Sequence, residues 1–466
     1  MQEDLIKNYN VTKEEEQEYL AYHSYRDVLY NLKSGVQQIK DYDLNAYKNS
    51  ILVCGAMAAF DKRVISFLNK WQSQQQNLFL LSEVTAQYRR YTKEYTNIPF
   101  ICTPHLLAKE MVVLGMNIPI TIKMWQLYKK KKYVKEAVKN FKKRHINIGK
   151  GYALVWGYYA YYYISKLIEN LQPKKVILWN EFYAFHHIFQ GICKERKIPL
   201  LYMEFGCLPG TICIEERGQQ GESIVAREYK LFSKKEISDR EIEKTKNVLR
   251  YLKETGMNRN IQPIKKMQNV LLQYYKAGRK TILYLGQNDY ESGMYPYTYI
   301  TKKFHSPIFR TSLDALQYLR LITIKNNWNL IYKPHPIMCA LKQSESKITK
   351  NIDIITDVDI NSAIDFSDLV ITILSQGAYI SLIRNKPVLM LGYTQLYGKD
   401  CTYEAFLKRE IEEKIETALE KGFTIVQNHN FIKHTTQILK YYLYDDGVDR
   451  KLRFGKDIES NRGKFI

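Results

Sequence analysis

The sequence lacks most of the features that mark secreted, membrane-spanning or metal-stapled proteins. Its seven cysteines are scattered through 466 residues with no Cys-x-x-Cys pair, so neither a disulfide framework nor a structural zinc site is expected. No run of eighteen uncharged apolar residues occurs, so no membrane-spanning helix is expected. The first twenty residues are rich in Glu and are neither cationic nor apolar, which argues against a signal peptide. These absences predict a protein of the reducing cytoplasm.

Several motifs of common enzyme classes are also missing. The chain has no P-loop, no zincin motif, no Gly-x-Ser-x-Gly elbow and no Gly-x-Gly-x-x-Gly, which argues against ATPases, metalloproteases, serine hydrolases and dinucleotide enzymes. Asp357-Val-Asp359 matches a metal-binding pattern, but Asn361-Ser362 signals a helix start directly after it, so capping is the favoured role. His186-His187 lies in an apolar helical segment and is interpreted as a packing or surface pair. We therefore expect no metal ion and no cofactor.

Positive charge is abundant and concentrated. The formal net charge is +22, and residues 121–150 hold eleven Lys and Arg against one acid, Glu136. This segment reads as a helix that leads into a Tyr-rich stretch at 152–163. A solvated basic helix beside a core helix, contact with an anionic membrane surface, and nucleic-acid binding are three interpretations. The last is disfavoured because no recognition-helix, zinc-finger or RNA-binding signature accompanies the charge. The predicted partner of this segment is an anionic membrane surface and not nucleic acid, and the solvated basic helix without a partner stays the alternative.

Short apolar runs alternate with helical segments of ten to fifteen residues in two regions of the chain, which indicates parallel, helix-covered sheets. The predicted class is α/β, with two Rossmann-like lobes, a helical connector and a C-terminal helix. The predicted parts are a helical preamble at 1–50, an N-terminal lobe at 51–222, a connector at 223–280, a C-terminal lobe at 281–425, and a C-terminal helix and tail at 426–466. In such an arrangement the active site is expected in the cleft, at the carboxyl ends of the strands.

The segment Asn329-Leu-Ile-Tyr-Lys-Pro-His-Pro joins an apolar strand to a rigid turn. Pro334 and Pro336 fix φ and forbid a helix there, so Lys333 and His335 are expected at the carboxyl edge of the strand. A lysine supplies a point charge and a histidine can donate to an oxygen, a combination that suits a phosphate. The alternative is a plain strand-to-loop turn whose prolines only set its geometry.

A second element suited to phosphate follows at 371–382. We predict that a strand ends near Leu374, that Ser375 occupies the N-cap of the next helix, and that Gly377 permits close approach of a ligand. Gln376 lies between them and is included in the predicted site. A routine N-cap is the competing interpretation, and the position of Ser375 after Lys-Pro-His-Pro in the same sheet favours a shared ligand.

Two carboxylates close strands of the N-terminal half. Glu181 follows the strand ending at Trp179, and Glu204 ends the next strand, just before a Gly-x-Leu-Pro turn. Acidic residues at adjacent strand ends are candidates for a general acid, a general base or a nucleophile. Capping or ion pairing is the alternative, with more weight for Glu181 than for Glu204. The predicted catalytic residues are thus Glu204 first and Glu181 second. The supporting residues are Asn180, Gly206 and Asp289.

These motifs together resemble a known family. Tyr-Lys-Pro-His-Pro at 332–336, Ser-x-Gly-Ala at 375–378 and Asn-Lys-Pro-Val at 385–388 are similar to segments of the capsule polysaccharide biosynthesis family, which includes retaining Kdo transferases. Glu-Phe-Gly-Cys-Leu-Pro at 204–209 and Ile-Glu-Glu-Arg-Gly at 214–218 resemble two further segments of that family. The family's Asp appears here as Glu215, its Gly-Val-Asn as Gly-Gln-Gln at 218–220, and its paired Ser or Thr as Ser375 with Gln376.

The resemblance implies a glycosyltransferase of the GT-B kind that uses a nucleotide-activated sugar, usually CMP-Kdo. It also implies that Lys333, His335 and Ser375 bind the nucleotide phosphate and the sugar. The expected acceptor is a lipid-linked or growing glycan at the cytoplasmic leaflet of the plasma membrane. One alternative is a polyol-phosphate transferase of the teichoic-acid type with a CDP-linked donor. A non-catalytic basic scaffold that binds membrane or nucleic acid is the other.

Overall fold

The structure is a computed structural model of the full chain. It describes residues 25–55, 62–73, 77–82, 96–103, 118–144, 149–258, 278–287, 289, 305–335, 353–356 and 358–446. The described chain divides into two compact units, one before and one after the bond between Met203 and Glu204. This division differs from the predicted lobe boundary at 222. It falls inside a strand, because the residues that follow Met203 pack with the second half of the chain.

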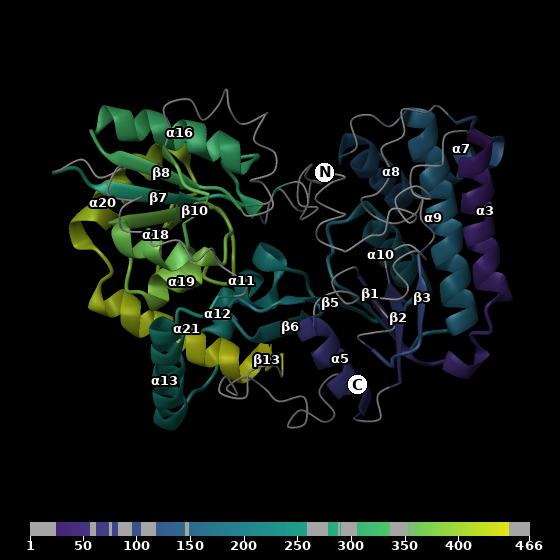
Figure 1. The fold of residues 1–466 in the computed structure, drawn as a ribbon, viewed down its shortest axis with the longest axis horizontal. Coiled ribbons are helices and arrows are strands. Elements are labelled where there is room, and N and C mark those ends of the chain that lie inside the picture. The colour runs from purple at the N-terminus through teal and green to yellow at the C-terminus, as the bar shows by residue number, and fades with distance from the viewer. Residues whose placement is uncertain are drawn as a thin grey trace. The chain divides into compact units, whose positions relative to one another are not determined.

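The first unit is a parallel α/β lobe (Figure 1). Its elements are α3 (Tyr25–Asp41), β1 (Ile51–Cys54), α5 (Lys62–Ser73), β2 (Leu78–Ser82), β3 (Phe100–Cys102), α7 (Ile122–Lys130), α8 (Lys132–Arg144), α9 (Lys150–Leu171), β4 (Lys175–Leu178), α10 (Ala184–Arg196) and β5 (Leu200–Phe205). The strands pair in parallel in the order β3-β2-β1-β4-β5. Numbered from the first strand, this is 3-2-1-4-5, the order of a Rossmann-type sheet.

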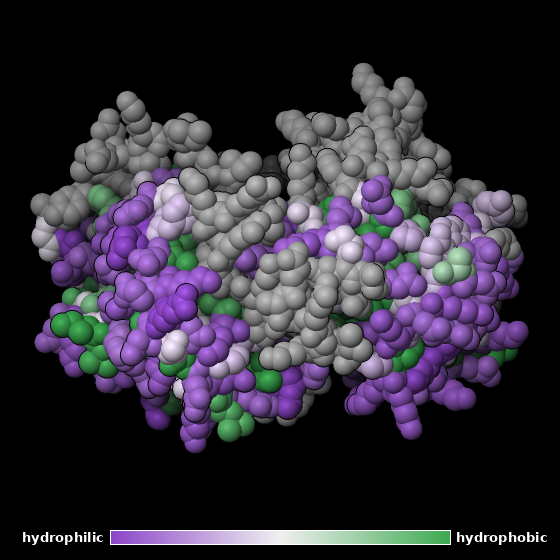
Figure 2. Space-filling model, turned by 90° about the horizontal axis from the view of Figure 1, so that it is seen from below, coloured by the Kyte–Doolittle hydropathy of each residue, from purple (hydrophilic) through white to green (hydrophobic). Residues whose placement is uncertain are grey.

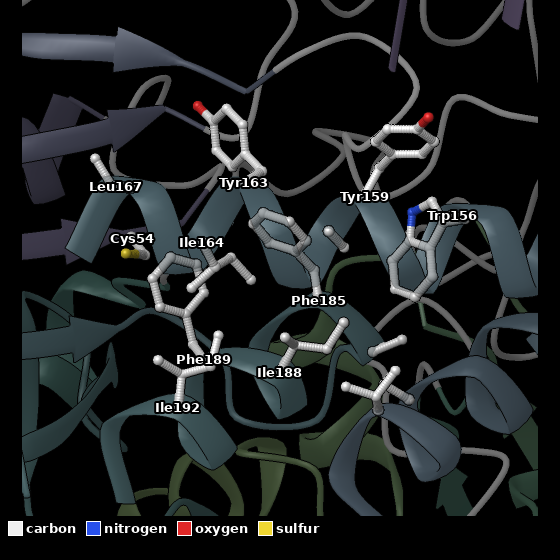
Figure 3. Close-up of a cluster of buried hydrophobic side chains, with 14 of the residues drawn as sticks. Cys54, Trp156, Tyr159, Tyr163, Ile164, Leu167, Phe185, Ile188, Phe189 and Ile192 are labelled. Carbon is white, nitrogen blue, oxygen red and sulfur yellow. The ribbon is translucent and has the colours of Figure 1, made fainter. Parts of the chain in front are cut away.

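The core of the first unit is built on one face of this sheet. Alternate residues of the strands, including Leu52, Phe79 and Val176, pack under helices α3, α8, α9 and α10. Figure 3 shows Ile164 of α9 beside Phe185 and Phe189 of α10, while Tyr163 points away from α10 on the other side of α9. The Tyr-rich stretch is therefore the interior of this lobe, as the core-helix interpretation predicted. Its long aromatic side chains supply much of the buried apolar area that stabilises the lobe.

The second unit contains a six-stranded parallel sheet and a small antiparallel pair. Its elements are β6 (Thr211–Glu215), α11 (Ile224–Arg227), α12 (Tyr229–Phe232), α13 (Asp239–Thr255), β7 (Thr281–Leu285), α16 (Ser312–Lys325), β8 (Asn329–Lys333), β9 (Asp353–Ile354), α18 (Ile360–Phe366), β10 (Leu369–Thr372), α19 (Gly377–Ile383), β11 (Val388–Met390), β12 (Tyr403–Glu404), α20 (Ile411–Lys421), α21 (Ile425–Tyr441) and β13 (Leu443–Asp445). The large sheet has the order β9-β8-β7-β10-β11-β12, or 3-2-1-4-5-6, and all of its pairs are parallel. The predicted α/β class with two Rossmann-like lobes is confirmed.

Several local predictions need correction. The basic segment 121–150 is not one helix, because Lys131 adopts an extended conformation between α7 and α8. Tyr403 and Glu404 form the short strand β12, which pairs with β11 at the sheet edge and was not predicted. Strands β6 and β13 were not predicted. They form an antiparallel pair, and β6 lies next to β5 in the strand order.

Two further predictions can be compared with the structure. Asp359 caps α18 by accepting the N–H groups of Asn361 and Ser362, which confirms the capping interpretation, while Asp357 lies outside the described residues. The helical preamble is described from Tyr25 onward, where it forms α3, and residues 1–24 also lie outside the described part. None of the described helices combines the length and the hydropathy needed to span a bilayer.

Candidate functional site

The strand order of the second unit creates a switch point between β7 and β10. From β7 the chain adds β8 and β9 on one side of the sheet, and it later adds β10, β11 and β12 on the other. Because all these strands are parallel, their carboxyl ends share one edge, and loops leave β7 and β10 in opposite directions there. Open α/β sheets bind ligands in the crevice outside this point. The predicted residues Lys333, Ser375 and Asp289 follow or end strands at this edge.

At β7 the loop begins with a glycine that the fold requires. A Cβ on Gly286 would lie 2.8 Å from the ring of Tyr332, and the Gly286 N–H donates to the Lys333 carbonyl at 2.9 Å. Gln287 follows, and its N–H donates to the Ser312 hydroxyl at the start of α16. The backbone therefore turns tightly at the switch point and is fixed to a helix N-terminus.

At β8 the predicted lysine and histidine lie where the sequence placed them. Lys333 is the last residue of the strand and is 8% exposed, and its ammonium donates to the Val358 carbonyl, just before α18. His335 is half-buried two residues further along. Lys333 thus fixes the loop before α18 to the end of β8, a structural role that the sequence did not reveal.

At β10 one prediction is wrong. Gln376, not Ser375, is the N-cap of α19, because the Ser375 carbonyl already accepts the Ala378 N–H in a tight turn. The Ser375 hydroxyl instead accepts the N–H of Gly377 at 3.1 Å. A Cβ on Gly377 would lie 2.5 Å from a methyl group of Leu285, so this glycine is required by packing against β7. The Ser375 hydroxyl and the Gln376 amide are the polar side-chain groups of this turn.

The Gln376 amide connects this turn to the segment that carries Glu204. Its Nε2 donates to the Phe205 carbonyl at 3.3 Å, within the second unit. Glu204 is half-buried, and its Oε2 accepts from the Gln220 amide at 3.1 Å. Glu204 was predicted as part of the N-terminal lobe. The structure groups it with the second unit and brings it into the same polar neighbourhood as Gln376.

A second carboxylate, Glu215, lies near Glu204. It is 7% exposed and accepts the N–H groups of Gly218 at 2.6 Å and Ile224 at 2.8 Å. Burial raises the pKa of Glu215 to about 8, and the negative charge of Glu204 acts in the same direction. Glu215 fixes the loop that carries Gln220. This role could not be predicted from the sequence, where Glu215 only takes the place of an Asp in the resembled family.

The nearby cysteines are not candidate nucleophiles. Cys207 and Cys213 are buried, and burial raises the pKa of the Cys207 thiol to about 12 and that of Cys213 well above its usual value. A thiol attacks as its thiolate, which burial disfavours here. Gly206, predicted as a supporting residue, has a packing role, since its Cβ would lie 2.0 Å from the Thr211 hydroxyl.

Asp289 belongs to a buried polar cluster beside the β7 loop. Its carboxylate accepts from the Ser312 N–H and from the Gln287 amide, both at 2.6 Å, and the Gln287 amide also contacts the His305 ring. Burial raises the pKa of Asp289 to about 6 and lowers that of His305 to about 3. At neutral pH an anionic Asp289 therefore faces the N-terminus of α16, where the helix dipole favours it. Asp289 thus fixes the β7 loop to the start of α16, and its supporting role toward a ligand stays a prediction.

Asn180 and Glu181 lie at the equivalent switch point of the first unit, after β4. The Asn180 side chain accepts the Phe182 N–H at 2.7 Å, and the Asn180 carbonyl bonds the ring of the buried His186. The packing interpretation of His186 is thus confirmed. Glu181 is 6% exposed, and its carbonyl accepts from Gln190. Among the residues that the structure describes, no group of three or more His, Cys, Asp or Glu side chains is placed to hold a metal ion.

The fold and its strand edges define a two-lobed α/β protein with doubly wound sheets. Neither a family model nor a curated protein sequence matches the chain. Similar solved structures include a Thermosulfurimonas dismutans KpsC chain described as a β-Kdo 2,7 transferase (16% identity, 60% of this chain and 80% of that chain, TM-score 0.39). They also include MnaA of S. aureus with UDP (12%, 89% and 94%, TM-score 0.37) and a UDP-GlcNAc 2-epimerase of Methanocaldococcus jannaschii with UDP-GlcNAc and UDP (12%, 84% and 98%, TM-score 0.35). Likeness of this degree assigns no reaction, so function has to be inferred from the residues of this chain.

Proposed function

We propose that the protein is a glycosyltransferase of the GT-B kind that moves a Kdo-like sugar from a cytidine nucleotide to a lipid-linked or growing surface glycan. The observation that carries the proposal is the switch point between β7 and β10, with Gln287 on one side and Ser375 and Gln376 on the other. The Lys333–His335 segment ends the next strand on the same edge. A strand edge that carries a lysine, an imidazole, a hydroxyl and amide groups suits a phosphorylated ligand.

The proposed division of roles follows from the chemistry of each group. His335 donates to a phosphate oxygen, Lys333 contributes positive charge from the end of β8, and the Ser375 hydroxyl and Gln376 amide contact the phosphate or the sugar. Glu204 is the proposed catalytic carboxylate. It either attacks the anomeric carbon or takes the acceptor proton while the donor phosphate leaves. Glu181, in the first unit, is kept as the second candidate.

The proposed place of work is the cytoplasmic leaflet of the plasma membrane, where a lipid-linked glycan is presented. The basic helices α7 and α8 support this location, because exposed lysines are attracted to anionic lipid. The protein would then be peripheral rather than membrane-embedded.

Calorimetric titration with CMP, CDP, UDP and GDP tests the proposal. Binding of CMP with the highest affinity supports a CMP-sugar donor. Preference for CDP would instead favour the polyol-phosphate transferase. If none of the four nucleotides binds, neither enzyme assignment survives.

His335→Ala should weaken nucleotide binding by about 1.5–3 kcal/mol, since it removes one charge-assisted hydrogen bond to phosphate. The measurement is the dissociation constant by calorimetry, with circular dichroism to show that the variant is folded. His429→Ala is the matched control, because His429 is an exposed histidine of α21. A folded His335→Ala protein with unchanged affinity would remove this residue from the site.

A further inference from the structure

Helix α8 carries a stripe of lysines on its outer face. Its apolar residues Val134, Val138 and Phe141 are buried in the core of the first unit. The exposed residues repeat with helical spacing on the opposite side, and they are Lys132, Lys135, Lys139, Lys142 and Lys143, with Glu136 as the one acid among them. Lys131, between α7 and α8, pairs with Glu195 at 2.8 Å, whereas the described lysines of the two helices form no ion pair. The stripe therefore faces solvent with five lysines and a single acid, Glu136.

Helix α7 adds exposed apolar side chains directly before this stripe. Ile122 is 78% exposed and Trp125 is 37% exposed, and they lie three residues apart on the outer face of the helix. The Trp125 ring stacks on Tyr128, and the ammonium groups of Lys129 and Lys150 lie 5.4 and 5.8 Å from its centroid. Of the five tryptophans of the chain, Trp71, Trp156 and Trp179 are buried, Trp328 is half-buried and Trp125 is exposed.

The combination is unusual for a freely solvated surface. Lysines three and four residues apart repel one another and destabilise an isolated helix. Exposing the apolar side chains of Ile and Trp to water is also unfavourable in free energy. The described surface visible in Figure 2 is mostly hydrophilic, with small hydrophobic areas. An anionic bilayer favours both features, because its headgroups attract lysines and its interface accommodates Trp and aliphatic side chains.

We propose that the outer face of α7 and α8 is a membrane-binding surface for anionic lipid, with Ile122 and Trp125 entering the headgroup region and the α8 lysines contacting lipid phosphates. This surface deepens the proposed function by specifying how the enzyme would reach a lipid-linked acceptor. Its binding does not depend on nucleotide or on transfer. The exposed apolar side chains favour a bilayer over nucleic acid as the partner. The phosphates of nucleic acid would attract the lysines but would not bind Ile122.

Sedimentation with vesicles tests the charge component. The full chain should bind vesicles of phosphatidylcholine with about 30% phosphatidylglycerol, bind weakly to phosphatidylcholine alone, and be released by high salt. Replacing Lys132, Lys135, Lys139 and Lys142 by Gln should lower the partition coefficient about a hundredfold or more, since each lysine near an anionic surface contributes about fivefold. The control replaces four exposed lysines of the second unit, Lys244, Lys253, Lys421 and Lys433, and should change binding little.

Tryptophan fluorescence tests the apolar component. Vesicles should shift the emission of the parent protein to shorter wavelength, and Trp125→Leu should abolish the shift because the other four tryptophans lie outside α7 and α8. Ile122→Ser should weaken binding several-fold without changing its salt dependence. Leu321→Ser with Ile324→Ser is the matched control, since both side chains are 65% exposed on α16.

Three results would overturn the proposal. The first is equal binding to neutral and anionic vesicles, and the second is no binding to either. The third is that the protein binds a single- or double-stranded oligonucleotide through the same lysines but does not bind vesicles. Because no nucleotide is present in these assays, their failure would leave the proposed transfer reaction untouched. Conversely, a protein that binds anionic vesicles through these residues but binds no nucleotide would keep the surface and lose the enzyme assignment.

Discussion

Glu204→Gln should bind the nucleotide donor as tightly as the parent protein and lose transfer by two or more orders of magnitude. Gln keeps an oxygen that can accept the Gln220 amide, so the local hydrogen bond seen at 3.1 Å can persist. It cannot take a proton or form a glycosyl ester, and a positioned acid or base contributes about 10²–10⁴ in rate. The measurements are donor affinity by calorimetry and the turnover rate with an acceptor glycan.

Two controls make this result specific. Glu216→Gln changes an exposed carboxylate twelve residues along the chain and should leave turnover near the parent value. Gln220→Met removes the amide that contacts Glu204 while keeping the bulk of the side chain. It should reduce turnover less than Glu204→Gln does, because it disturbs the position of the carboxylate but not its chemistry. Near-parent turnover in a folded Glu204→Gln protein would show that Glu204 is structural.

The sequence predicted those parts of the fold that depend on periodic apolar patterns. The strands at 51–54, 281–285 and 329–333 each contain at least three consecutive apolar residues, and each forms an interior strand of a parallel sheet with both faces buried. The short strands β6, β12 and β13 were missed. Tyr403–Glu404 has only two residues, and β13 depends on pairing with β6, more than two hundred residues earlier. Such pairing leaves no local pattern to read.

The sequence predicted where the candidate site residues lie along the strands, but not which other residues they contact. The turn chemistry placed Lys333, His335 and Ser375 at strand ends, because proline and glycine restrict the backbone locally. The order 3-2-1-4-5-6, which puts β7 and β10 side by side, is a long-range property. The same holds for the hydrogen bond between Gln376 and Phe205, and for the bond from Lys333 to Val358. These contacts decide which predicted residues can share a ligand.

Glu215 was the residue that sequence reasoning most underrated. Its neighbours in the chain, Ile214 and Glu216, give no sign that its carboxylate is 7% exposed and bonded to two backbone N–H groups. Those bonds fix the loop that includes Gln220, whose amide contacts Glu204. Glu215 therefore positions the proposed catalytic carboxylate through one intermediate residue.

Glu215→Gln should change how stability depends on pH. Burial raises the pKa of Glu215 to about 8 in the folded protein, from the ordinary value of 4.5 that it regains on unfolding. Between these values the unfolded chain is ionised while the folded protein keeps a proton. Raising the pH therefore favours unfolding, by at most about 1.4 kcal/mol for each pH unit. Below about pH 4.5 both states are protonated and the effect disappears. Gln does not titrate, so the variant lacks this contribution.

The free energy of unfolding, measured by urea denaturation at pH 5 and at pH 7.5, gives the test. The difference between variant and parent should move in favour of Glu215→Gln by about 2–3 kcal/mol over this range. Other buried groups, such as Glu404 with its pKa raised to about 7, titrate in both proteins and cancel in the difference. Glu216→Gln, at the exposed neighbouring position, should show no such movement. If the curves of parent and Glu215→Gln stay parallel, the Glu215 carboxylate is ionised in the folded protein, and its two backbone hydrogen bonds outweigh the effect of burial.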